Sequence, residues 1–81
     1  MYYWTARNSG TFLNGYRTAN TLQTAVREAF CYLRGELYGE GTISIYDCDP
    51  YTQMADTGYW PERIRGYMCD CNTGYKIVRV N

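Results

Sequence analysis

The chain has 81 residues, with ten tyrosines, two tryptophans, no histidine, and eight basic against eight acidic side chains. This length suits a single domain, residues 1–81, and no apolar stretch approaches the length of a membrane span. The zero net charge argues against strong electrostatic binding to nucleic acid. So short a chain has a small core, so several of its many aromatic rings are expected at the surface.

The first twenty residues predict a β-hairpin. Residues 2–7 read as a strand that ends at the turn-forming residues 8–10, and residues 11–18 are expected to return as a second strand. Arg7 and Arg17 are the only charged side chains in this stretch. They make the hairpin a basic surface of small size.

The next segment, from about Thr21 to Arg34, predicts an amphipathic helix. Asn20 is expected to cap its N-terminus, with Gln23 reaching back, and Gly35 or Gly39 is expected to end it. Apolar side chains recur along it at helical spacing, at Leu22, Ala25, Val26, Ala29, Phe30 and Leu33. We expect this stripe to pack on one face of a sheet.

The second half of the chain predicts mostly strands. Four stretches have this character: residues 42–46, 51–56, 64–71 and 75–80. In the first, Ile43 and Ile45 point to one face, and Thr42, Ser44 and Tyr46 point to the other.

The expected fold is α+β, an antiparallel sheet of four to six strands in ββαββ(β) order with one amphipathic helix on one face. One helix covers only one face of such a sheet, so the other face is expected to meet water or a partner.

The cysteines leave three interpretations open. Cys48, Cys69 and Cys71 lie in the strand-rich half, and a strand would place Cys69 and Cys71 on the same face. They could bind a metal together with nearby aspartates, form a disulfide, or stay reduced as small hydrophobic side chains. Their spacing differs from that of zinc fingers, and reduced thiols are the expected state. Cys31 falls on the outer face of the helix and is expected to react fastest with thiol reagents.

Nothing in the sequence predicts an enzyme or a cofactor. The commonest general base is missing, and no neighbour that would activate a cysteine nucleophile is apparent. The glycine-rich stretch at residues 39–41 precedes a strand rather than a helix, so it does not match a phosphate-binding loop.

The candidate binding site lies in and after residues 47–63. It combines aromatic rings with arginines, the side chains that dominate binding hot spots. The expected contact residues are Tyr51, Tyr59, Trp60, Arg63, Arg65 and Tyr67. The hairpin that carries Tyr3, Arg7 and Arg17 is the next candidate. RNA-binding sheets also place aromatic rings beside basic residues, but their Lys/Arg-Gly-Phe type of signature is missing, so direct nucleic-acid binding is expected to be weak.

The order of elements resembles that of several small phage-encoded anti-defence proteins, including some anti-CRISPR proteins. The helix at residues 21–30 (TLQTAVREAF), the glycine-rich link and the strand at residues 42–47 (TISIYD) carry this resemblance. It is a resemblance of architecture and assigns no role to any residue. It implies a phage- or mobile-element-encoded inhibitor that occludes a binding surface of a larger protein or nucleoprotein complex, such as a CRISPR effector, in the host cytoplasm.

The sequence therefore predicts a small non-catalytic binding module. Two alternatives stay open: a small RNA- or DNA-binding sheet domain, and a structural accessory protein that forms homo-oligomers. Free sheet edges would allow a homodimer. The aromatic run Met1-Tyr2-Tyr3-Trp4 is interrupted by Arg7 and does not form the apolar core of a signal peptide, so a cytoplasmic location is expected.

Overall fold

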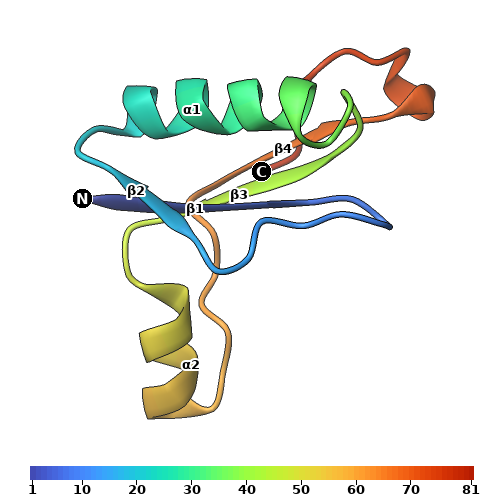
Figure 1. The fold of residues 1–81 in the computed structure, drawn as a ribbon. Helices are drawn as coiled ribbons and strands as arrows, with labels where there is room; N and C mark the ends of the chain where they lie inside the picture. Colours follow the sequence, from blue (N-terminus) through green and yellow to red (C-terminus); the bar gives the residue numbers. More distant parts are fainter.

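The computed structural model describes residues 1–81 as a five-stranded antiparallel sheet with α1 on one side and α2 on the other (Figure 1). The elements follow in the order β1 (Tyr2–Arg7), β2 (Arg17–Ala19), α1 (Leu22–Gly35), β3 (Gly41–Tyr46), α2 (Pro50–Thr57), β4 (Arg65–Cys69), a 3-10 turn (Cys71–Thr73) and β5 (Val78–Arg79). The spatial order of the strands is β2-β1-β3-β4-β5. The predicted α+β fold and its ββαββ(β) order are confirmed.

The register of the two central strands gives the sheet two different faces. Trp4 pairs with Ile45 and Ala6 pairs with Ile43, and all four side chains are buried beneath α1. Alternate residues of a strand point to opposite faces, so Ser44 points away from α1. We call the face opposite α1 the open face.

Helix α1 packs on the sheet through two alanines and one leucine. Ala25, Ala29 and Leu33 are fully buried, whereas Val26 and Phe30 are half-buried at the sides. The alanines have little side-chain volume, so the helix can lie close to the sheet. The predicted apolar stripe does face the core, but its centre follows the alanines.

The two ends of α1 differ in how well the sequence predicted them. The side chain of Thr21, which has an extended backbone, accepts the backbone N–H of Thr24 at 3.1 Å. The predicted Asn20 cap is therefore wrong. The helix ends at Gly35, as expected, and Gly39 adopts a left-handed φ of 82° while its N–H donates to the carbonyl of Leu33.

The predicted strand at residues 51–56 is wrong, because this segment forms α2. The Asp49 carboxylate accepts the backbone N–H groups of Tyr51 and Thr52 at 3.0 and 3.2 Å. Pro50 occupies the first helical turn, where its missing N–H is no loss, and Gly58 ends the helix in a left-handed conformation. These local signals outweigh the strand-like pattern of side chains.

The strands predicted at residues 11–18, 64–71 and 75–80 are all shorter in the structure. The expected strand at 11–18 is reduced to β2, with one isolated bridge between Arg7 and Phe12. The terminal hairpin forms between β4 and β5. Cys69 ends β4 and is buried, whereas Cys71 lies exposed in the 3-10 turn, so the expected shared strand face is wrong.

All four thiols are free, and Cys31 is exposed on α1. No three cysteine, aspartate or glutamate side chains gather closely enough to hold a metal ion. Neither helix has the length and apolar character needed to cross a membrane.

Candidate functional site

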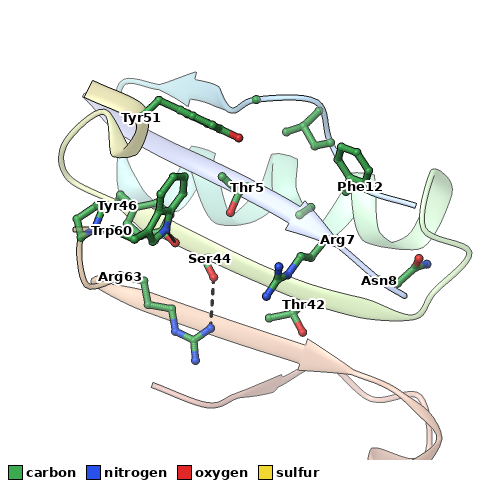
Figure 2. A pocket seen from close by; sticks show the side chains of 14 residues that line it. Thr5, Arg7, Asn8, Phe12, Thr42, Ser44, Tyr46, Tyr51, Trp60 and Arg63 are labelled. Carbon is green, nitrogen blue, oxygen red and sulfur yellow. Dashed lines mark hydrogen bonds between the residues drawn. The ribbon is translucent and has the colours of Figure 1, made fainter. Parts of the chain in front are cut away.

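The open face carries a groove of about 730 Å³, which we call the open-face groove (Figure 2). Its 14 lining residues come from β1, β3, the segment after β1, helix α2 and the segment that leads into β4. Thr5, Thr42 and Ser44 contribute hydroxyl groups to its floor, because their positions in β1 and β3 point away from α1. The floor is therefore polar but uncharged.

Two aromatic rings form a wall at one end of the groove. The Trp60 indole N–H donates to the Tyr46 hydroxyl at 2.8 Å, and the two rings meet edge to face. Tyr51, from α2, packs edge to face on Trp60 with 5.1 Å between ring centroids. Trp60 and Tyr51 keep 45% and 48% of their surface exposed. Tyr46 thus fixes the position of this wall, while parts of the Trp60 and Tyr51 rings remain exposed in the groove.

A second layer of contacts supports this wall. Tyr16 stacks on Tyr51 and meets Tyr3 edge to face, with centroid distances of 5.9 and 5.2 Å. The Tyr16 hydroxyl donates to the Asp49 carboxylate at 2.6 Å. This hydrogen bond lowers the pKa of Asp49 and raises the pKa of Tyr16. It ties the N-terminal cap of α2 to the segment that precedes β2.

Arg63 lies in a defined position at the edge of the groove, beside β4. Its Nη1 donates to Ser44 Oγ at 3.3 Å, and its guanidinium lies over Gly66 (Figure 2). A Cβ atom at position 66 would lie 2.5 Å from Arg63 Cζ, which is closer than real contacts allow. Glycine at this position therefore makes room for the arginine.

Positive charge in the groove has no negative counterpart in its lining. Arg7, exposed at the end of β1, extends over the floor toward Thr42, and Phe12 lies beside it (Figure 2). Arg7 and Arg63 are the two charged side chains among the lining residues, which include no aspartate or glutamate. The groove thus offers guanidinium donors to an anion and aromatic rings to an apolar group.

The structure divides the residues predicted as one site. Tyr51, Trp60 and Arg63 line the open-face groove, whereas Tyr59 is highly exposed beyond the end of α2 and outside the lining. The remaining two lie on the α1 side of the sheet: Arg65 lines a cleft beside α1, and Tyr67 packs edge to face on Phe30.

The sequence did not identify the other half of the groove. Arg7 was only a second candidate, and Phe12, Thr5, Thr42 and Ser44 were not site candidates. The alternation of residues 42–46 correctly indicated that Thr42 and Ser44 share a face. Pairing of β1 with β3 brings Arg7 to that face, and no local pattern signals this pairing.

No protein-family model, curated protein or solved structure matches this chain.

Proposed function

We propose that this protein is a non-catalytic binding module whose open-face groove docks an acidic segment of a protein or nucleoprotein partner. The observation that carries the proposal is the pairing of Arg7 and Arg63 with an aromatic wall in a groove without carboxylates. Arginine binds carboxylates through two parallel hydrogen bonds, and tryptophan, tyrosine and arginine dominate binding hot spots.

The groove is suited to one side-chain cluster of such a segment. Its volume of about 730 Å³ lies within the usual range of ligand pockets. A carboxylate would bind between Arg7 and Arg63, and a neighbouring apolar side chain would pack on Trp60. Trp60 and Arg63 are already held by Tyr46 and Ser44, so little conformational freedom is lost on binding.

The proposed mode of action is occlusion, with one copy of the protein covering one site of the partner. A partner segment held in the groove is unavailable to the partner's own ligand. This is the inhibitory action that the resemblance to anti-CRISPR proteins implies, and a CRISPR effector would be one such partner in the host cytoplasm.

Selection from a random library of short displayed peptides tests the proposal. We expect the wild-type protein to enrich peptides with Asp or Glu beside an aromatic residue. The double variant Arg7→Gln, Arg63→Gln should lose the preference for acidic residues, whereas Arg34→Gln on α1 serves as the matched control and should retain it. Identical peptides selected by all three proteins, or no enrichment at all, would contradict the proposal.

Single-stranded nucleic acid is the second candidate ligand, because the same carboxylate-free pair of arginines would accept phosphates. With two phosphate contacts, a plot of the logarithm of the binding constant against the logarithm of the salt concentration should have a slope of about −1.4. Fluorescence anisotropy with a labelled oligothymidylate measures this slope. Oligonucleotide binding tighter than that of the selected peptides would favour this candidate over the protein partner.

A further inference from the structure

A second basic cleft lies on the other side of the sheet, between α1 and β4. It has a volume of about 620 Å³ and is lined by eight residues, and we call it the α1–β4 cleft. Three arginines line it, Arg27 and Arg34 from α1 and Arg65 from β4, and its lining includes no acidic residue. It shares no residue with the open-face groove.

The two helical arginines lie on one side of α1 without an acidic partner along the helix. Arg27 and Arg34 are seven residues apart, which is about two helical turns. Ion pairs on a helix form between residues three or four positions apart. Those positions hold no Asp or Glu; they are occupied by Gln23, Thr24, Phe30, Cys31, Leu37 and Tyr38. Both guanidinium groups are therefore available to an external anion.

Arg65 contributes a buried donor that the polypeptide does not satisfy. It pairs with Ile45, whose side chain faces α1, so the Arg65 side chain lies on the same face, beside the helix. Its Nε atom is buried and has no hydrogen-bond partner. Buried polar groups nearly always have a partner, so this donor needs an ordered water or an acceptor from outside the chain. The other buried donor without a partner, Trp4 Nε1, does not line this cleft.

We propose that the α1–β4 cleft binds a phosphate group, held by Arg27, Arg34 and Arg65. A single arginine can satisfy a carboxylate through two parallel hydrogen bonds, whereas the terminal oxygens of a phosphate can accept from three guanidinium groups. Val26 and Phe30 line the same cleft, so an apolar or aromatic group attached to the phosphate would have a surface to pack on. The site is independent of the proposed function of the open-face groove.

The Nε–H resonances of the arginines provide a direct test by nuclear magnetic resonance. Titration with phenyl phosphate should shift the Arg65 Nε–H signal in a saturable manner, and the affinity for the α1–β4 cleft is read from this signal alone. Benzoate, which has the same ring with a carboxylate, should bind more weakly. The double variant Arg27→Gln, Arg34→Gln changes only exposed side chains and should weaken phenyl phosphate binding about tenfold or more. Arg79→Gln, at an exposed position in β5 that lines neither cleft, serves as the matched control and should leave it unchanged.

Inorganic phosphate identifies the source of the ligand. If inorganic phosphate binds as tightly as phenyl phosphate, the site is supported and assigned to free phosphate. If phenyl phosphate binds more tightly than inorganic phosphate, the site is assigned to an organic phosphate. Three outcomes would overturn the proposal: no saturable shift of Arg65 Nε–H, equal affinity for benzoate and phenyl phosphate, or unchanged binding by the Arg27, Arg34 double variant.

Discussion

Arg63 and Arg65 lie on opposite faces of the sheet, although a regular strand would place both on the same face. Arg65 begins β4 and pairs with Ile45 on the α1 side, whereas Arg63 reaches over Gly66 to Ser44 on the open face. The chain that leads into β4 is irregular and turns Arg63 away before the strand begins. As a result, each of the two basic surfaces receives one of these arginines.

Replacement of Gly66 by alanine should displace Arg63 and weaken binding in the open-face groove. The added Cβ would collide with the far end of the Arg63 side chain, which can be displaced without moving the backbone, so the free energy of unfolding should change by no more than about 1 kcal/mol. Peptide binding and thermal unfolding measured on Gly66→Ala check this prediction. Gly35→Ala is the control, because its Cβ would meet no neighbouring atom. Full binding by Gly66→Ala would show that the position of Arg63 is unimportant.

Leu33→Ala should destabilise the protein more than Phe30→Ala. Leu33 is fully buried in the core, and removing it should cost about 2–5 kcal/mol, enough to threaten the fold of a small domain. Phe30 is half-buried against Tyr67, so its loss removes less apolar contact. Chemical denaturation of both variants gives the comparison. A larger loss for Phe30→Ala would mean that the packing centre of α1 lies elsewhere.

Tyr16→Phe should reduce stability at neutral pH, and the difference from wild type should depend on pH. The hydrogen bond from Tyr16 lowers the pKa of Asp49, so its stabilisation is fully present above the ordinary value of 3.8 and is lost as the pH falls below it through the lowered folded-state pKa. The same bond raises the pKa of Tyr16, so the stabilisation is also lost as the pH rises from 10.0 through the raised value.

Denaturation of wild type and Tyr16→Phe at several pH values measures this window. Tyr38→Phe, at a highly exposed position, should match wild type throughout. A difference between wild type and Tyr16→Phe that stays constant from acidic to neutral pH would argue against the bond to Asp49.

Trp60→Ala should loosen α2 without unfolding the rest of the protein. The helix is tied to the sheet by aromatic contacts that run from Tyr51 through Trp60 to Tyr46, whereas α1 is fixed by the buried core. Amide hydrogen exchange should become faster in residues 53–58 and stay unchanged in α1. Tyr59→Ala, at an exposed ring outside this chain of contacts, is the control. Equal acceleration in both helices would show that Trp60 supports the whole domain.

Cys31 should react preferentially with an anionic reagent. It lines the α1–β4 cleft beside Arg27 and Arg34, whereas Cys71, also exposed, follows Asp70. The ratio of alkylation rates with iodoacetate and with uncharged iodoacetamide should therefore be higher at Cys31 than at Cys71, and phenyl phosphate should reduce the iodoacetate rate at Cys31 alone. Mass spectrometry resolves the two sites. Equal ratios at both cysteines would argue against a positive potential in the cleft.

Local patterns predicted the parts of the fold that depend on local spacing. The apolar period of α1 and the alternation of Ile43 and Ile45 both appear in the structure as expected. The sequence also contains helix-start signals for α2, namely Asp49 as the N-cap and Pro50 in the first turn, but its short sequence resembles a strand that follows a turn. Here the cap, rather than the pattern of side chains, determined the structure.

The open-face groove could not be predicted in full, because its two sides meet only through long-range pairing. Arg7 and Ser44 are brought together by β1 and β3, which lie on either side of α1 in the sequence. Sequence spacing carries no information about which strands become neighbours at the centre of the sheet. The separation of Arg63 from Arg65 could not be predicted either. The prediction of one site assumed that side chains alternate regularly between the two faces of the sheet, and the irregular segment before β4 breaks this alternation.

The central claim is that a partner segment docks on the open face, and mapping a selected acidic peptide by chemical-shift perturbation tests it most directly. We expect saturable changes at the backbone amides of Thr5 and Ser44 and at the indole N–H of Trp60, with Ala25 and Ala29 in α1 unaffected. Perturbations confined to α1 and the α1 side of β4 would contradict the claim.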